Sequence, residues 1–280
     1  MSRRKIAVIG HVEHVTLGSV SEVPKAGEIA HMQNTRVMPG GGGGIAFAQL
    51  VRSDAEVHLF TALGNDEGGA WVRAQLLRVR EHVHIHAAQR DEPHPRVVVM
   101  VDGGAKRTIV VTHEPLQPRA SDALPWSTLA TFDAVYFTGS HPDTLVLARA
   151  ARILLATARR RPALDAARIA VDVVVGSVSD PRENAPLEAY AVTPAALVLT
   201  DGPRPIRVVR AAGETRVEPP ARVDTVRGDY GAGDSFAAAL TYFVACDVAL
   251  EDAVKAAGPY GAAVLAGIDP RDGQALLTRP

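Results

Sequence analysis

Short apolar runs alternate with helical stretches along most of this chain. The first run, residues 6–9, is followed directly by Gly10, which is typical of a strand buried on both faces of a parallel sheet. Similar runs occupy residues 57–62, 134–138, 169–175 and 196–200. Apolar residues recur every three or four positions elsewhere, which predicts helices at 45–52, 67–80, 144–160, 235–245 and 250–265. The alternation predicts an α/β fold with a mostly parallel central sheet and helices on both faces.

Two stretches interrupt this alternation, at residues 11–37 and 83–111. The second contains strand-like runs at 96–101 and 108–111 on either side of a turn at 102–104. No internal repeat, low-complexity linker or composition change divides the 280 residues. We therefore expect a single domain over 1–280, with the two interruptions forming a small β lid.

Composition disfavours several classes of protein. With 30 basic and 31 acidic residues the formal net charge is −1, so nucleic acid is not expected as a partner. No apolar run approaches the roughly 18 residues of a membrane helix, and the run at 6–9 is too short for a signal peptide, so we expect no membrane partner. The single Cys246 cannot form an internal disulfide and fits a cytoplasmic location.

The sharpest local motif is Gly-Ala-Gly-Asp-Ser-Phe at 231–236, followed at once by strong helix formers. Small residues before a helix leave backbone N–H groups open to an anion at the positive end of the helix. Asp234 beside such a cradle could accept a proton from a hydroxyl group while the amides stabilise a transferred phosphoryl group. The alternative is a glycine turn whose aspartate only stabilises the start of the helix.

Five consecutive glycines, Gly40 to Gly44, precede the helix predicted from Ile45. Without β-carbons this backbone could approach a ligand closely, or it could be a flexible loop. The run is neither a dinucleotide fingerprint nor a Walker loop, because no Gly-Lys-Ser/Thr follows it. A nicotinamide-dependent dehydrogenase is therefore poorly supported.

Together and in this order, these motifs resemble those of the ribokinase-like carbohydrate kinases, the phosphofructokinase-B family. The resemblance includes Thr-Ala-Leu-Gly-Asn-Asp-Glu-Gly-Gly at 61–69 and Pro-Lys-Ala-Gly-Glu at 24–28, so it spans nearly the whole chain. It implies transfer of the γ-phosphoryl group of ATP to a hydroxyl of a sugar or sugar derivative. Asp234 would be the general base, and the amides of Gly231, Ala232 and Gly233 would form the anion hole.

The resemblance also implies roles for other residues. Thr200 and Gly202 would lie on the nucleotide side, and the helix around Lys255, Ala256 and Gly258 would border adenine. Glu13 and the glycines Gly41, Gly42 and Gly43 would face the sugar. Arg107, in the second lid strand, could reach a phosphate or an acidic sugar, or could simply be a surface residue.

Three departures from the family pattern stand out. Gly-Asp-Tyr at 228–230 replaces the usual Asp-Thr before the anion hole, and the asparagine expected after the N-terminal glycines is absent. The Asn-x-x-Glu motif associated with Mg²⁺ is also absent, but Asp180 and Glu183 have its spacing, and we assign them to a water-mediated Mg²⁺ site. A solvated Asp-Pro turn is the alternative. The resemblance leaves a monovalent cation and a homodimer formed through the lid as further expectations.

Histidines alternate at His82, His84 and His86, which would place them on one face of a strand. Imidazoles at this spacing could hold a metal ion, but a solvated face of an edge strand is the more common explanation. Two other functions remain open: a nucleoside kinase of the same family, and a non-catalytic sugar- or nucleotide-binding regulator that has kept the fold.

Overall fold

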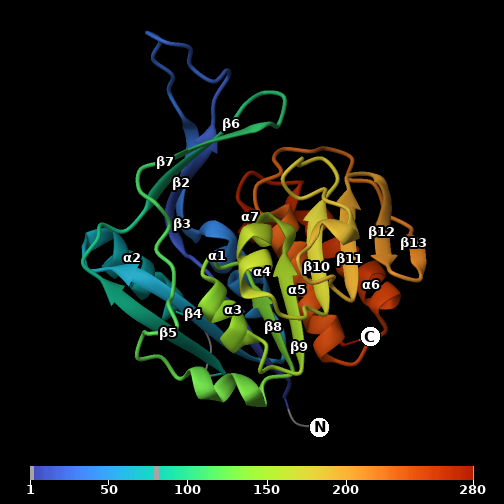
Figure 1. Cartoon of the computed structure of the whole chain (residues 1–280). Coiled ribbons are helices and arrows are strands. Elements are labelled where there is room, and N and C mark those ends of the chain that lie inside the picture. Colours follow the sequence, from blue (N-terminus) through green and yellow to red (C-terminus); the bar gives the residue numbers. More distant parts are fainter. Residues whose placement is uncertain (1–2, 79–81, 280) are drawn as a thin grey trace.

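The computed structural model describes residues 3–78 and 82–279, which form two sheets (Figure 1). The larger sheet has nine strands in the order β13-β12-β11-β10-β9-β8-β1-β4-β5. Neighbouring strands from β11 to β5 are parallel, and β12 and β13 form an antiparallel hairpin at the other edge. The strands are β1 Lys5–Ile9, β4 Glu56–Gly64, β5 Val83–Arg90, β8 Ala134–Phe137, β9 Ile153–Thr157, β10 Val173–Ser177, β11 Ala196–Asp201, β12 Arg204–Arg210 and β13 Gly213–Val217. The α/β architecture predicted from the sequence is confirmed.

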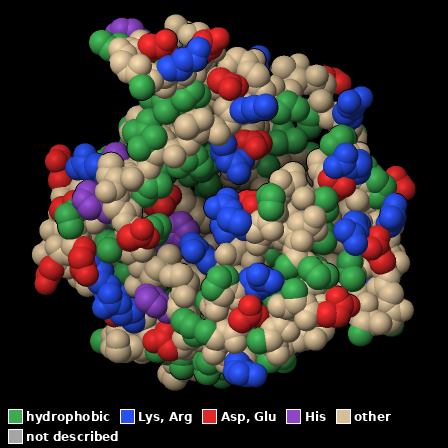
Figure 2. Space-filling model, turned by 45° about the horizontal axis from the view of Figure 1, so that its top comes forward, with side chains coloured by type: hydrophobic (Ala, Val, Ile, Leu, Met, Phe, Trp, Pro, Cys, Tyr) green, Lys and Arg blue, Asp and Glu red, His purple; other side chains and the backbone are tan. Residues whose placement is uncertain are grey.

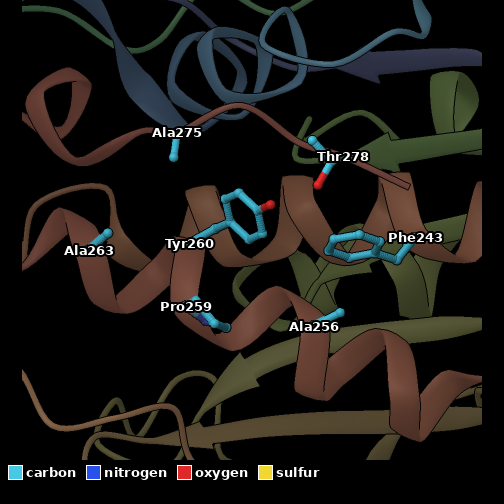
Figure 3. A pocket seen from close by; sticks show the side chains of 7 residues that line it. All are labelled: Phe243, Ala256, Pro259, Tyr260, Ala263, Ala275 and Thr278. Atoms are coloured by element: carbon cyan, nitrogen blue, oxygen red, sulfur yellow. The ribbon is translucent and has the colours of Figure 1, made fainter. Parts of the chain in front are cut away.

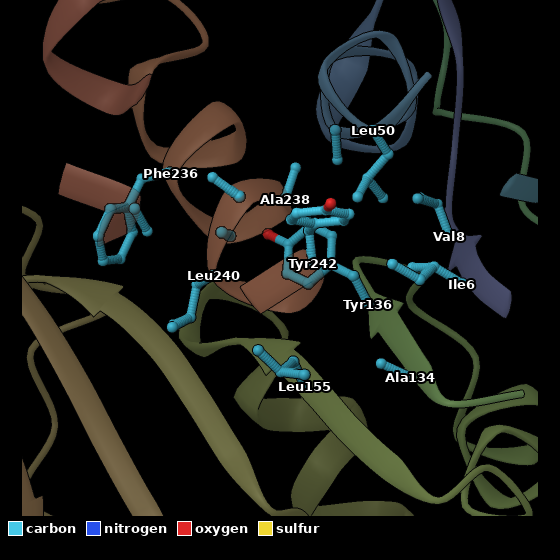
Figure 4. Packing of buried hydrophobic residues seen from close by; sticks show 14 of the residues in the cluster. Ile6, Val8, Leu50, Ala134, Tyr136, Leu155, Phe236, Ala238, Leu240 and Tyr242 are labelled. Carbon is cyan, nitrogen blue, oxygen red and sulfur yellow. The ribbon is translucent and has the colours of Figure 1, made fainter. Parts of the chain in front are cut away.

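Helices cover both faces of this sheet because alternate residues of its strands face opposite sides. In β1, Ile6 and Val8 pack with four helices, whereas Ala7 and Ile9 pack with two others. Figure 4 shows the first side, where Ala238, Leu240 and Tyr242 of one helix meet the strands. The first group is α1 Gly41–Leu50, α2 Glu67–Leu76, α5 Ala232–Ala245 and α6 Leu250–Val264; the second is α3 Pro142–Ala148 and α4 Arg161–Ala167.

The short elements complete the fold. They are α7 Pro270–Gly273 and the 3-10 helices η1 Trp126–Thr131, η2 Ala158–Arg160 and η3 Leu187–Ala189. In the described part of the chain, no helix combines the length and the apolar character needed to cross a bilayer.

A four-stranded sheet, which we call the lid, arches away from the α/β body (Figure 1). Its order is β3-β2-β6-β7, with β2 and β6 parallel and the outer pairs antiparallel. Its inner apolar residues pack on Ile45 of α1 and on Tyr230. The strands are β2 Glu13–Ser19, β3 Gln33–Gly40, β6 Arg96–Val101 and β7 Arg107–Val111.

The lid segment predicted at 83–111 begins too early. Residues 83–90 form β5, which pairs with β4 at the edge of the large sheet, and only β6 and β7 belong to the lid. The reason is that β5 is half-buried along most of its length, and a strand of this kind fits an edge of either sheet.

The helix predicted at 144–160 is wrong. The chain instead forms α3, then strand β9, then η2. The run Ile-Leu-Leu-Ala at 153–156 is a fully enclosed strand, but the many Ala, Leu and Arg residues around it are also strong helix formers. Burial between β8 and β10 decided in favour of the strand.

Several element boundaries also differ from the expectations. The strand predicted at 169–175 begins at Val173, and the β12–β13 hairpin was not anticipated. Helix α1 begins at Gly41, so the glycine run is its first turn and not a loop. Helix α2 ends at Leu76; the end of the helix predicted at 67–80 lies outside the described residues.

Candidate active site

Asp234 lies in the first turn of α5, which begins at Ala232. The preceding Gly231 has a φ of +82°, and a Cβ there would lie 3.0 Å from Pro270 and 3.1 Å from Ile45. A side chain at this position would therefore be strained and crowded. The first-turn amides of a helix have no partners within the helix, and the space where a Cβ of Gly233 would lie is open to 4 Å. The motif thus forms an accessible helix N-terminus suited to an anion.

The glycine run meets Asp234 across the carboxyl ends of β1 and β8. A Cβ on Gly42 would lie 2.5 Å from Thr138 Oγ1 and 3.3 Å from Asp234 Oδ1. A Cβ on Gly41, whose φ is +74°, would lie 2.8 Å from a ring carbon of His11. The absence of side chains therefore lets α1 begin directly against the strand ends, where open parallel sheets bind their ligands.

Burial and nearby charges place the pKa of Asp234 at about 7. Removal from water raises the pKa most, and the Glu183 carboxylate adds to it, while the guanidinium groups of Arg159 and Arg107 act in the opposite direction. The Tyr136 hydroxyl lies 3.5 Å from Asp234 Oδ1 and is a further polar neighbour. A carboxyl group with this pKa is suited to take a proton at neutral pH.

A second buried polar cluster lies beside the glycine run and consists of His11, Glu13 and Arg160. Burial raises the pKa of Glu13 to about 7, although Arg160 opposes the shift. Burial, helped by Arg160, lowers the pKa of His11 to about 3, so its ring is neutral at physiological pH. The Arg160 side chain is anchored by a 3.0 Å hydrogen bond that its Nε donates to the Thr138 carbonyl oxygen. This cluster places fixed polar groups next to Gly41.

Asp180 and Glu183 converge, as their spacing predicts, but Arg159 lies between them. Its guanidinium nitrogen is 2.8 Å from Asp180 Oδ2 and 2.6 Å from Glu183 Oε1. Hydrogen bonding to Arg182 lowers the pKa of Asp180 to about 2. Because both carboxylates already carry a guanidinium partner, they fit contact with a hydrated Mg²⁺ ion better than direct ligation.

Arg107 connects the lid to the segment before the anion hole. Its guanidinium lies 2.6 Å from Asp229 Oδ2 and also donates to the Asp229 carbonyl oxygen. The next residue, Tyr230, is buried, and its hydroxyl accepts a 3.3 Å hydrogen bond from the Gly41 amide. The unusual 228–230 segment therefore links β7, the glycine run and the start of α5.

The expected nucleotide-side residues are spread over a wider area. Thr200 is the last residue but one of β11, before Asp201, and its hydroxyl donates to the Gly176 carbonyl oxygen. Gly202, with a φ of +58°, forms the turn to β12. On α6, Lys255 is exposed, and a Cβ of Gly258 would meet Pro220 at 3.1 Å.

Ala256, also on α6, lines a surface pocket of about 480 Å³ (Figure 3). Phe243 borders the same pocket, nine residues after Asp234 on α5, which is about 13 Å along a helix axis. Gly258 does not line this pocket, because its Cβ position packs against Pro220 instead. The other lining residues are Pro259, Tyr260, Ala263, Ala275 and Thr278.

Sequence reasoning missed Tyr136, Arg159 and Arg160 as site residues. Both arginines follow directly after β9, the strand taken for helix, so their place at the carboxyl edge of the sheet was not visible. Tyr136 lies inside a predicted strand, where it looks like any other core residue. Only the position of its hydroxyl beside Asp234 identifies it as a site residue. Figure 2 shows a hollow between the lid and the α/β body, with Lys and Arg side chains along its rim.

Comparison with known proteins agrees with this geometry. The model of the pfkB family carbohydrate kinases matches residues 3–272, so the chain belongs to this family and is a carbohydrate kinase. A search of curated proteins finds no significant match.

Solved structures share the fold at low sequence identity. A putative ribokinase from Agrobacterium tumefaciens is 19% identical, with a TM-score of 0.80, and the alignment covers 98% of this chain and 95% of that one. Adenosine kinase from Sinorhizobium meliloti is 18% identical, with a TM-score of 0.75 and 96% of both chains covered. Arabidopsis thaliana ribokinase, solved with ribose and ATP, is 14% identical, with a TM-score of 0.72 and 100% of both chains covered.

Proposed function

We propose that this enzyme transfers the γ-phosphoryl group of ATP to a hydroxyl group of a sugar or sugar derivative, with Asp234 as the general base. The observation that carries the proposal is the position of Asp234. Its carboxyl group, with a pKa of about 7, lies at the open N-terminus of α5 and against the glycine run. A base and an anion cradle side by side are what phosphoryl transfer to a hydroxyl group requires.

In this proposal Asp234 accepts the proton of the attacking hydroxyl as that oxygen bonds to the γ-phosphorus and the bond to the ADP oxygen breaks. The amides of Gly231, Ala232 and Gly233 then receive the charge that builds up on the transferring group. Glu13 and Gly41 to Gly43 hold the sugar beneath the lid. Arg107 and Asp229 keep the lid next to the reacting groups and limit the access of water.

ATP as the donor is supported by the Arabidopsis ribokinase structure, which contains ribose and ATP. We assign the nucleotide side to Thr200 and Gly202, with Lys255, Ala256 and Gly258 on α6. Asp180 and Glu183 would hold the water shell of Mg²⁺, which neutralises phosphate charge when it is bound. A monovalent cation stays a prediction.

One other class of acceptor competes with a sugar or sugar derivative. The similarity to an adenosine kinase favours a nucleoside as the second candidate. Membership of the pfkB family favours an enzyme over a non-catalytic regulator. We also propose a homodimer formed through the lid and a cytoplasmic location, the latter because Cys246 is a free thiol.

The experiment is a screen for phosphorylated product with ATP and Mg²⁺ across pentoses, hexoses, sugar acids, sugar phosphates and nucleosides. Asp234→Asn is expected to lower turnover on the accepted substrate by about 10²–10⁴-fold, because an amide cannot take the proton. Asp252→Asn is the matched control, since Asp252 is an exposed carboxylate in the first turn of α6. Equal turnover in Asp234→Asn and the wild type would refute the mechanism, and product formed only on nucleosides would select the rival acceptor.

A further inference from the structure

A cluster of histidines lies near the amino ends of β4 and β5, away from the carboxyl ends that carry the candidate active site. Strand β5 is the last strand of the large sheet, and its residues pair with those of β4 in the register His58 to His84 and Phe60 to His86. Residues two apart on a strand share a face, so His58, His84, His86 and Glu56 all point to one side. They lie near the amino ends of β4 and β5 (Figure 1), whereas the candidate active site lies at the carboxyl ends.

Three side chains of this cluster bring their donor atoms together. The ligand atoms of Glu56, His58 and His84 all lie within 4.8 Å of one another. Glu56 Oε1 is 3.0 Å from His58 Nε2 and 3.9 Å from His84 Nε2. Ligands about 2.1 Å from a tetrahedral zinc ion lie about 3.4 Å apart, so small rotations of the side chains would complete such a site.

The surroundings hold the His58 ring in place. His86 Nε2 lies 2.9 Å from His58 Nδ1, and the Phe132 and His58 rings form a T-shaped pair at 4.7 Å between centroids. When Nδ1 donates its proton to His86, Nε2 is left with the lone pair that a metal ion needs. His86 itself packs on Phe60 at 4.6 Å. Few rotamers therefore have to be fixed when an ion binds.

We propose that Glu56, His58 and His84 bind a divalent transition-metal ion of the zinc class, with water completing the coordination and His86 positioning His58. Two imidazoles and one carboxylate form a donor set that suits zinc and leaves a position open. His84 is 45% exposed, so the ion has access from solvent. The ion would tie edge strand β5 to β4 and stabilise the fold without taking part in phosphoryl transfer.

Lys5 is the group that opposes this site. Its ammonium nitrogen lies 3.1 Å from Glu56 Oε1, the same oxygen that faces both histidines. An ion must displace this ammonium or act against its charge. Removing the charge of Lys5 is therefore expected to tighten metal binding, whereas removing a ligand is expected to weaken it. If the histidines were grouped by chance and bound no ion, neither substitution would change the affinity for metal.

The test uses the full chain, stripped of metal and without a histidine tag. Co²⁺ is titrated while its visible absorption is followed, Zn²⁺ is added in competition, and the unfolding temperature is measured with and without Zn²⁺. We expect one ion per chain and a higher unfolding temperature with Zn²⁺. His84→Ala is expected to raise the dissociation constant more than tenfold, and His86→Ala about 10–100-fold. Lys5→Gln is expected to lower the dissociation constant.

His113→Ala is the control, because His113 is an exposed histidine outside the cluster. Its affinity and its unfolding temperature are expected to match the wild type. The proposal is overturned if the wild type takes up no Co²⁺ in excess metal, or if His84→Ala binds as tightly as the wild type. It is also overturned if His113→Ala weakens binding as much as His84→Ala does.

Discussion

The carboxyl group of Asp234 experiences opposing influences from its neighbours. Burial and Glu183 raise its pKa, while Arg159 and Arg107 lower it, and the result of about 7 shows that burial has the larger effect. A general base must be deprotonated to act, so kcat/KM is expected to fall as the pH drops below about 7 and to level off above it.

Replacing Arg159 with Gln is expected to move this pH dependence. The change removes a positive charge that lowers the pKa of Asp234, and it leaves the charge of Glu183 without its partner. The pKa of Asp234 should then rise, and activity should be lost at a higher pH than in the wild type. The measurement is kcat/KM as a function of pH. Arg182→Gln is the control, since Arg182 pairs with Asp180 and is largely exposed; an unmoved profile in Arg159→Gln would contradict this view of the site.

Gly42 shows how little room the site leaves. An added Cβ would lie 2.5 Å from Thr138 Oγ1, below normal contact, and 3.3 Å from Asp234 Oδ1. Gly42→Ala is expected to destabilise the protein by about 1–3 kcal/mol and to lower kcat, because α1 must shift away from the base. Denaturant unfolding and turnover measure the two effects. Gly103→Ala, where the nearest atom lies at 3.7 Å, should leave both unchanged; equal effects of the two variants would count against a packing constraint at Gly42.

Among the elements, β9 has the largest consequence for the site. It lies between β8 and β10 in the large sheet, and its end delivers Arg159 and Arg160 to the carboxyl edge. Its side chains alternate between the two apolar cores, with Leu155 on one side and Leu154 on the other. A strand enclosed in this way depends on burial and not on local propensity.

Leu155→Ala is therefore expected to lower the free energy of unfolding by about 2–5 kcal/mol, because a fully buried side chain leaves a cavity. Val146→Ala on α3 is the control. Val146 is 48% exposed, and its replacement should change stability by no more than about 0.5 kcal/mol. Urea unfolding of both variants supplies the comparison. A small effect of Leu155→Ala would contradict the central place of β9.

For the whole molecule, the lid is the part with an unexplained surface. Its outer strand β7 is an edge strand in which Ile109, Val110 and Val111 are 42%, 51% and 46% exposed. Exposed apolar residues on a sheet edge are often covered by another chain. Val37 on β3, at the opposite edge of the lid, is 42% exposed. We therefore propose that a second copy of the chain covers part of the lid.

Light scattering is expected to give twice the 29.6 kDa mass of one chain. Val110→Lys should shift the protein towards the monomer, because a charge on the contact surface would have to be desolvated. Val146→Lys, at a similar exposure on α3, should leave the dimer intact. A wild-type monomer at micromolar concentration would rule out pairing through the lid.

Local signals in the sequence were enough for the class of fold and for the position of Asp234 at the start of a helix. Continuous apolar runs predict buried parallel strands wherever they occur, and the motif at 231–236 predicts a helix N-terminus because glycine and alanine leave its amides open. The structure agrees on both points, since β1, β4, β8 and β11 lie where they were expected and Asp234 lies in the first turn of α5.

Tertiary structure alone decided which groups surround Asp234. Leu, Ala and Arg favour helix locally, so only enclosure between two strands made residues 153–157 a strand and placed Arg159 between Asp180 and Glu183. Likewise, β5 joined the large sheet and not the lid, which brought His84 next to His58 and Glu56. Distances between residues far apart in the chain depend on how the elements pack, and no local pattern contains that information.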